Sequence, residues 1–218
     1  MTIITEIWTN NSDKINQLLK DYEDKSSYSI IRRDRERGRG GGVAVLFNRH
    51  KIQMARARLP QSDFEVLAGI GRRQGQRRKV CVVAVYLPPW YNAAKNRRCL
   101  QFINDCLVLL NSRYNDPYIF LRADFNNRDV KQAIKDLPRI KIIKTAATRG
   151  HNILDIIARN ATADVTEFGV RCPITDNNNV GSDHGVVYAS LRMTRVPAYS
   201  VREYSYLHVN DEGIQKFG

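Results

Sequence analysis

The sequence lacks any apolar run close to the ~20 residues that a membrane-spanning helix needs, so we expect no membrane segment. It also lacks a basic segment followed by an apolar one near its first residue, which argues against a signal peptide. Cysteine is scarce, and no pair forms a CxxC motif or has the spacing of zinc ligands. We therefore expect an intracellular protein with reduced cysteines in its core, namely Cys81, Cys99, Cys106 and Cys172.

Acidic residues are also in short supply. The 218-residue chain has 35 Lys and Arg residues against 22 Asp and Glu residues, which gives a net charge of +13. This surplus favours a polyanionic partner, either nucleic acid or an anionic membrane face. The alternative is a basic surface without a specific partner. A hydrophobic content of 43% is typical of a globular protein, and the length suits one domain with or without a tail.

Strand-like patterns outnumber helical ones along the chain. The continuous run "VCVVAVY" (80–86) predicts a central strand, and one apolar face along 93–114 predicts a strong helix. We expect an α/β protein of the α+β type, a two-layer β-sandwich flanked by helices over residues 1–193, followed by a tail at 194–218. The expected strands are 2–8, 27–32, 43–47, 52–59, 64–70, 80–86, 118–124, 140–143, 153–158, 165–170 and 185–193, and the expected helices are 12–22, 93–114 and 130–137.

Two polar side chains follow the apolar part of the strand "YIFLRAD". Asp124 and Asn126 lie two residues apart, so they can share one face at the strand end. A carboxylate beside a carboxamide can orient a water molecule, with the carboxylate accepting its proton. The alternative is an ordinary turn, because "DFNNRD" is rich in Asn and Asp.

A second signal is "GSDHG" (181–185), just before the last apolar strand. Asp183 adjoins His184, and neighbours on a strand face opposite sides, so the carboxylate that supports the His184 ring must come from elsewhere. Asp155 in "NILDII" is the candidate, since a lone acid in an apolar strand is costly unless it is paired. Otherwise, His184 is a loop histidine without a role.

Two further side chains are candidates at strand ends. Glu6 in "TEIW" could be a ligand of Mg²⁺, which favours carboxylates, water and a substrate phosphate. The alternative for Glu6 is an exposed residue of a strand. Tyr86 ends "VCVVAVY" and could donate its hydroxyl to a phosphate oxygen, or it could be an aromatic cap on the core.

The order of these strand ends resembles the endonuclease/exonuclease/phosphatase family, which includes apurinic endonucleases and pancreatic deoxyribonuclease. More narrowly, "RDRERGRGGGVAVLF", "TRGHNILDIIARN" and "SDHGVV" resemble the endonuclease domain of non-LTR (LINE-type) retrotransposons. The resemblance covers about residues 1–193 and implies a DNase-like fold. The tail segment "YSVREYSYLHVNDEGIQKF" resembles the one that leads toward the reverse transcriptase.

The resemblance implies roles for residues that contact metal and phosphate. Glu6 matches the family's metal-binding Glu, which implies Mg²⁺ or Mn²⁺. Tyr86 matches a Tyr that contacts the scissile phosphate, and Thr148 matches a Thr or Ser near that phosphate in retrotransposon members.

It also implies roles for the residues that act on water and the leaving group. Asp124 and Asn126 match the water-orienting pair. Asp155 matches the Asp that orients the catalytic His, which is His184 here. Asp183 matches the Asp before that His, to which metal binding or leaving-group assistance is assigned.

The sequence departs from the family in two places. The usual first strand, with an Asn that helps to hold metal and phosphate, is missing, and Arg122 stands where small residues usually precede the Asp. Arg122 could disturb the site or reach for DNA. The other basic candidates for DNA contact, each of which could also be a solvated turn, are Arg35, Arg37, Arg39, Arg72, Arg73, Arg77 and Arg78.

The implied activity is that of a magnesium-dependent endonuclease. It would nick double-stranded DNA and leave a 3′-hydroxyl for target-primed reverse transcription. We therefore expect a nuclear monomer whose partner in the full element is the reverse transcriptase domain. Two alternatives remain: a catalytically impaired DNA-binding module, and a phosphomonoesterase or phospholipid hydrolase on the same fold.

Overall fold

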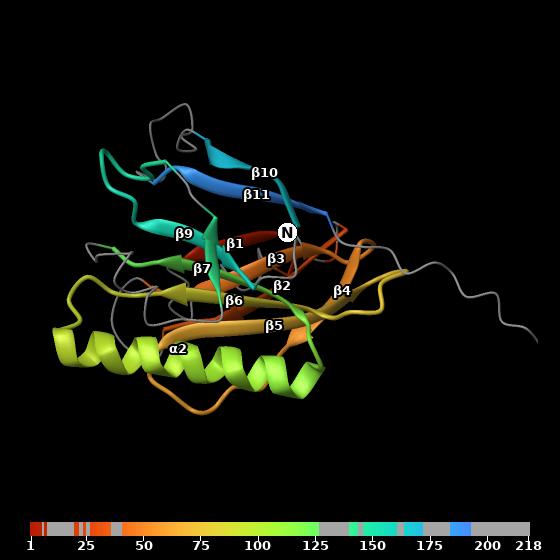
Figure 1. Ribbon diagram of the computed structural model, residues 1–218, viewed down its shortest axis with the longest axis horizontal. Helices are drawn as coiled ribbons and strands as arrows, with labels where there is room; N and C mark the ends of the chain where they lie inside the picture. The colour runs from red at the N-terminus through yellow and green to blue at the C-terminus, as the bar shows by residue number, and fades with distance from the viewer. Residues whose placement is uncertain are drawn as a thin grey trace, which may run out of the picture.

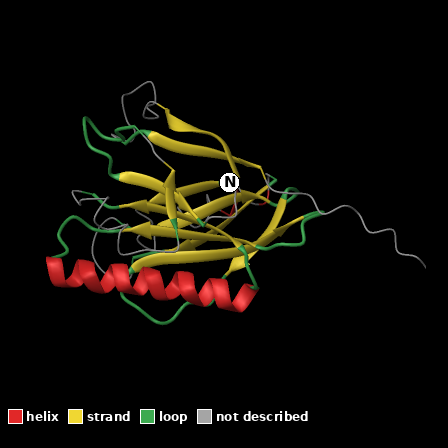
Figure 2. Ribbon diagram, in the orientation of Figure 1, coloured by secondary structure: helices red, strands yellow, loops and turns green. Residues whose placement is uncertain are grey.

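The computed structural model describes residues 1–5, 7, 20–21, 24, 27–35, 41–126, 140–143, 146–160, 164–171 and 184–192. In these ranges the chain forms two β-sheets, a two-stranded ribbon and the long helix α2 (Figure 1). Strands therefore dominate the described residues (Figure 2). None of the helical segments described is long and apolar enough to cross a membrane.

The larger sheet has six strands in the order β4-β5-β6-β7-β9-β8. Only β6 and β7 pair in parallel, and each of the other neighbouring pairs of this sheet is antiparallel. A parallel pair needs a crossover connection, which α2 supplies here. The strands are β4 (Ile52–Arg56), β5 (Glu65–Arg73), β6 (Val80–Tyr86), β7 (Tyr118–Asp124), β8 (Lys141–Ile143) and β9 (Asp155–Arg159).

The smaller sheet has three antiparallel strands in the order β1-β3-β2. Its strands are β1 (Thr2–Thr5), β2 (Tyr28–Arg33) and β3 (Val43–Asn48). The ribbon pairs β10 (Asp164–Arg171) with β11 (Val186–Arg192), also antiparallel. Figure 1 shows this ribbon on the opposite side of the molecule from α2.

Both faces of β6 are buried, which explains its uninterrupted apolar sequence. Val82 and Ala84 face the smaller sheet and pack in one core cluster with Val43 and Val45 of β3. Val83 and Val85 face the other way and pack in a second cluster with Ile103 and Leu107 of α2. The molecule is thus a β-sandwich with a helix on the outer face of its larger sheet.

Helix α2 spans Ala93–Tyr114, as the apolar periodicity predicted. Asn92 caps its N-terminus, since the side-chain oxygen accepts a hydrogen bond from the backbone N–H of Lys95 at 2.9 Å. Asn115 ends the helix in the left-handed conformation, with φ 46°. The helix therefore begins directly after the loop that leaves β6.

The expected α+β sandwich is confirmed, whereas several strand boundaries differ. The first strand ends at Thr5 rather than residue 8, the fourth ends at Arg56 rather than residue 59, and β9 begins at Asp155 rather than residue 153. The expected helix at 130–137 and the tail at 194–218 lie outside the described residues. Most of the expected helix at 12–22 lies outside them too, although Lys20 and Asp21 are helical.

Candidate active site

A row of polar side chains crosses the larger sheet at one end of its central strands. Glu65 of β5 is paired in register with Tyr86 of β6, Tyr86 with Asp124 of β7, and Asp124 with Asp155 of β9. Residues directly opposite one another on adjacent strands point to the same face. Tyr86 packs in the cluster between the two sheets, so this row faces the smaller sheet.

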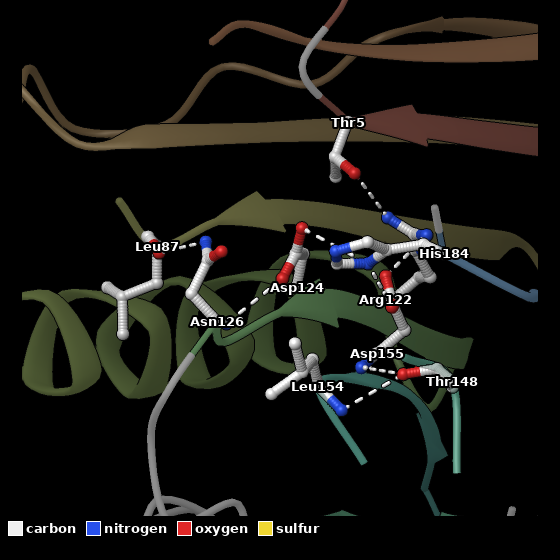
Figure 3. A network of polar contacts seen from close by, with 9 residues as sticks. All are labelled: Thr5, Leu87, Arg122, Asp124, Asn126, Thr148, Leu154, Asp155 and His184. Atoms are coloured by element: carbon white, nitrogen blue, oxygen red, sulfur yellow. Dashed lines mark hydrogen bonds and ion pairs between the residues drawn. The ribbon is translucent and has the colours of Figure 1, made fainter. Parts of the chain in front are cut away.

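Asp155 lies at the centre of the contacts in this row (Figure 3). It has no solvent exposure, yet both of its carboxylate oxygens have a cationic or potentially cationic neighbour. Oδ1 accepts from Nη2 of Arg122 at 2.8 Å, and Oδ2 lies 2.7 Å from Nδ1 of His184. The Thr148 hydroxyl oxygen accepts from the backbone N–H groups of Leu154 and Asp155 and so fixes the start of β9.

The contact with Asp155 also fixes the orientation of the His184 ring. A carboxylate only accepts hydrogen bonds, so the Nδ1–H group of the ring is the donor, and the contact sets the tautomer of the imidazole. The backbone next to His184 is anchored, because the N–H of Gly185 donates to the carbonyl of Thr148 at 2.6 Å. Thr148 thus supports both partners of the pair.

Asp124 sits beside this pair as a second buried carboxylate. Burial, followed by repulsion from Asp155, raises the pKa of Asp124 from 3.8 to about 6. The backbone N–H of Asn126 donates to Oδ1 of Asp124 at 3.0 Å, and this hydrogen bond lowers the pKa of Asp124. Its Oδ2 lies 4.0 Å from Nδ1 of His184. A carboxylate with a pKa of about 6 can accept a proton from water near neutral pH.

Asn126 is held in a conformation that few residues adopt. Its φ is 50°, in the left-handed region that Asn tolerates better than most side chains. Its amide Nδ2 donates to the carbonyl of Leu87 at 2.8 Å, which fixes the orientation of the amide. The remaining amide oxygen is then the atom available to orient water or a phosphate.

These side chains fit a divalent cation in part. One ligand atom each from Asp124, Asp155 and His184 lies within 4.8 Å of the others. Both oxygens of Asp155 already contact Arg122 and His184, so the best-placed ligand for a hard cation is the Asp124 carboxylate. The predicted ligands Glu6 and Asp183 lie outside the described residues.

The remaining predicted residues do not share one location in the structure. Tyr86 lies within the row and is buried in the core between the two sheets. Arg122, a predicted DNA contact, bridges Asp155 and the Thr5 hydroxyl of β1. Arg35 forms an ion pair with Glu65 within the row. Arg37 and Arg39 lie outside the described residues.

The basic hairpin between β5 and β6 lies at the other end of those strands. Gly71 pairs with Val80 there, whereas Glu65 pairs with Tyr86 in the row. At ~3.3 Å per residue, the hairpin is roughly 20 Å along the strand from Tyr86. Its arginines therefore lie away from the row of polar side chains, and their role in DNA contact stays a prediction; they are Arg72, Arg73, Arg77 and Arg78.

Sequence reasoning missed Glu65, the first member of the row. Its Oε1 accepts from Nε of Arg35 at 2.9 Å, and its Oε2 accepts from the backbone N–H of Gly42. Gly42 has a φ of +84°, and an added Cβ would meet the Ile7 side chain at 2.8 Å, so only glycine suits this contact. The signal was present: Glu65 is a lone acid in the apolar run "FEVLAGIG", as Asp155 is in "NILDII".

The fold is that of the endonuclease/exonuclease/phosphatase proteins. The chain is similar to an endonuclease/exonuclease/phosphatase from Bacteroides vulgatus, with a TM-score of 0.64 and 13% identity over 89% of this chain and 85% of that one. It is also similar to mannosyl-6-phosphatase Bt3783 of Bacteroides thetaiotaomicron VPI-5482, with a TM-score of 0.64 and 13% identity over 87% and 84% of the two chains.

A third similar structure is D. rerio TDP2 complexed with a single-strand DNA product, with a TM-score of 0.60 and 13% identity over 88% of this chain and 85% of that one. No family model matches the sequence, and no curated protein matches it either. At these identities the likeness establishes the fold, and the chemistry has to be argued from the side chains.

Proposed function

We propose that this protein is a metal-dependent phosphodiesterase that nicks DNA and leaves a 3′-hydroxyl end. The observation that carries the proposal is the Asp155–His184 pair, which lies beside a second carboxylate, Asp124, with a raised pKa. A supported imidazole and a carboxylate that can accept a proton are the two groups that hydrolysis of a phosphodiester requires.

In the proposed reaction, water attacks the phosphorus in line with the leaving oxygen. Asp124 accepts the proton of that water, and the amide oxygen of Asn126 orients it. Both side chains are positioned by the backbone around the end of β7, through the N–H of Asn126 and the carbonyl of Leu87. Because Asp124 is buried, little rearrangement is needed before the proton moves.

His184 acts on the other charge that develops in the reaction. Its Nδ1–H is held by Asp155, so a protonated ring presents Nε2–H to a phosphate oxygen. The Asp155 carboxylate lies between His184 and Arg122, where it can offset the charge of the ring. A divalent ion held next to Asp124 by the proposed ligands Glu6 and Asp183 would supply additional positive charge at the phosphate oxygens.

The choice of DNA as substrate rests on the net charge of the chain and on the resemblance of its sequence motifs. The net charge of +13 suits a polyanion, and one protein of the same fold was solved with a single-strand DNA product. The resemblance of the motifs to LINE-type endonucleases favours a nuclear role in which the 3′-hydroxyl primes reverse transcription. The reverse transcriptase domain of the same element would then be the partner.

The test is relaxation of supercoiled plasmid by the purified protein in Mg²⁺, with EDTA as the metal-free control. We expect nicks in Mg²⁺ and none in EDTA, and we expect polymerase extension from the nicked ends to show a 3′-hydroxyl. His184→Asn should lower nicking by at least about a hundredfold, which is typical for loss of a group that stabilises transition-state charge. Plasmid that stays supercoiled with the folded parent protein in Mg²⁺ would rule the activity out.

A matched control variant is His50→Asn. His50 is exposed in the turn after β3 and should leave nicking unchanged. If the two histidine substitutions lower nicking equally, the loss reflects general damage, and the role assigned to His184 is wrong.

The competing function is phosphomonoester hydrolysis, which is favoured by the similarity to a mannosyl-6-phosphatase. Two chromogenic substrates separate these reactions: bis(p-nitrophenyl) phosphate is a diester and p-nitrophenyl phosphate a monoester. We expect turnover of the diester to exceed that of the monoester. The reverse preference would favour the phosphatase.

A further inference from the structure

The loop between β6 and α2 displays a tryptophan at the catalytic end of the sheet. Trp90 is 63% exposed, more than any other large hydrophobic side chain among the described residues. The loop starts at Leu87, whose N–H donates to the carbonyl of Asp124 at 2.9 Å and whose carbonyl accepts from Asn126. Trp90 follows this anchor three positions further along the chain, at the same end of the larger sheet.

The loop is held rigidly on both sides of Trp90. Pro88 and Pro89 restrict the backbone before it, and the N–H of Tyr91 donates to the carbonyl of Pro88 at 3.2 Å. The ring of Tyr91 is buried and packs edge-on against Phe64, with centroids 6.4 Å apart. Asn92 then caps α2. Trp90 is thus kept in solvent by its neighbours, although burial of so large an apolar side chain would be favourable.

Arg35 supports the indole from the side of the polar row. Its guanidinium carbon lies 4.8 Å from the centroid of the Trp90 ring and 5.8 Å from that of Tyr86. The guanidinium is also paired with Glu65, and both side chains are largely buried. Because Glu65 balances the charge of Arg35, this arginine is better suited to hold the indole than to attract a phosphate.

We propose that Trp90 is a base-stacking residue, which receives an unpaired nucleobase next to the scissile phosphate of a nucleic-acid substrate. The inference rests on the proposed function and adds a binding site to it. A rigid indole loses little conformational entropy when it binds, and every base offers a π-face, so the contact contributes affinity without base preference. The phosphate of the same nucleotide would then reach Asp124 and His184.

The sequence contains two tryptophans, Trp8 and Trp90, which makes the test direct. In the Trp8→Phe variant, the tryptophan fluorescence comes from Trp90 alone. We would titrate it in EDTA with a single-stranded thymidine oligonucleotide and with an abasic oligonucleotide of the same length. The proposal predicts quenching by the first and much weaker quenching by the second, since only the first carries bases. If Trp8→Phe fails to fold by circular dichroism, the difference in emission between the parent and Trp90→Phe gives the same measurement.

Affinity gives a second measurement. Trp90→Ala should weaken binding of the thymidine oligonucleotide between about fivefold and about a hundredfold, the range expected for one base stacked on an aromatic ring. Tyr28→Ala is the matched control, because Tyr28 is also an exposed aromatic, 37% exposed, but lies at the opposite end of β2 from Arg33. Its binding should match that of the parent.

Several results would overturn the inference: equal quenching by the two oligonucleotides, no quenching by either, or equal loss of binding in Trp90→Ala and Tyr28→Ala. Quenching by mannose 6-phosphate as strong as by the oligonucleotide would show that the ring receives a sugar instead. These results are independent of nicking. If the protein shows base-dependent quenching but never nicks DNA, the stacking role of Trp90 holds and the proposed function is wrong. If the protein nicks DNA but shows no such quenching, the proposed function holds and the stacking role is wrong.

Discussion

The two ends of the β5–β6 strand pair differ in charge and in construction. At one end, Glu65 and Tyr86 begin a row of buried polar groups that continues to Asp124 and Asp155, each fixed by hydrogen bonds or packing. At the other end, a turn carries exposed arginines such as Arg72 and Arg77. The first end holds the groups of the proposed reaction, and the second suits long-range attraction of a polyanion. The net charge of the chain therefore does not locate its reactive site.

Substitution of Asp124 should give the largest difference in plasmid nicking between variants at the two ends of the sheet. Asp124→Asn keeps the shape of the side chain but removes its ability to accept a proton, so nicking of plasmid should fall by at least about a hundredfold. Asp116→Asn is the matched control at the hairpin end, where Asp116 is exposed and pairs with Arg78. We expect it to nick like the parent. Equal activity of both variants would remove the distinction between the two ends.

Two arginine–aspartate pairs allow the same comparison for stability. Arg122 and Asp155 are largely buried, with side-chain exposures of 15% and 1%, whereas those of Arg78 and Asp116 are 28% and 63%. Arg122→Met leaves a buried carboxylate with one partner fewer and should lower the free energy of unfolding by about 3 kcal/mol. Arg78→Met should lower it by about 1 kcal/mol or less. Urea unfolding followed by circular dichroism measures both, and similar losses would contradict the comparison.

The raised pKa of Asp124 predicts how stability depends on pH. The folded-state pKa of about 6 exceeds the ordinary value of 3.8, so the folded protein binds the proton more tightly than the unfolded chain does. This contribution to stability is complete below pH 4 and is lost as the pH rises through 6. Asp124→Asn lacks that loss, so its stability relative to the parent should rise by about 2 kcal/mol between pH 4 and pH 7.

Urea unfolding in EDTA at several pH values would show this change. A pH-independent difference for Asp124→Asn would mean that Asp124 does not titrate as an isolated buried acid.

Substitutions in the basic hairpin between β5 and β6 should have the smallest effect on DNA binding and cleavage. Replacement of Arg72 and Arg73 by Gln should leave cleavage of a very short duplex unchanged, because such a duplex cannot span the roughly 20 Å between the hairpin and Tyr86. A longer duplex should bind a few-fold more weakly, and the slope of log affinity against log salt should decrease by about one for each phosphate that the hairpin no longer binds. Gel-shift titrations at several salt concentrations measure this slope. An equal effect on both duplex lengths would mean that the hairpin influences the catalytic end directly.

The parts of the fold that follow from local patterns could be predicted from the sequence. The limits of α2, β6 and β7 were visible, because each is set by a cap, a proline or the end of an apolar run. The start of β9 was not, because it depends on the Thr148 hydroxyl, which accepts hydrogen bonds from the N–H groups of Leu154 and Asp155 from outside the strand. Interactions of this kind depend on tertiary structure.

The same distinction holds in the site. The pairing of His184 with Asp155 could be expected, since a lone acid in an apolar strand needs a partner. The roles of Arg122 and Arg35 could not, because an arginine in a sequence gives no indication of whether its charge faces DNA or a buried carboxylate. Here both have buried carboxylates as partners, Asp155 and Glu65.

Arg122 also joins the two layers of the sandwich. One side of its guanidinium binds Asp155 in the larger sheet, and the other donates to the Thr5 hydroxyl in the smaller one at 2.8 Å (Figure 3). The spacing between the layers is thereby coupled to the carboxylate that orients the imidazole. A change in the packing of β1 against β3 would therefore shift Arg122 and, through Asp155, the orientation of the His184 ring. The strand at the edge of the smaller sheet is in this way mechanically linked to the imidazole on which the proposed reaction depends.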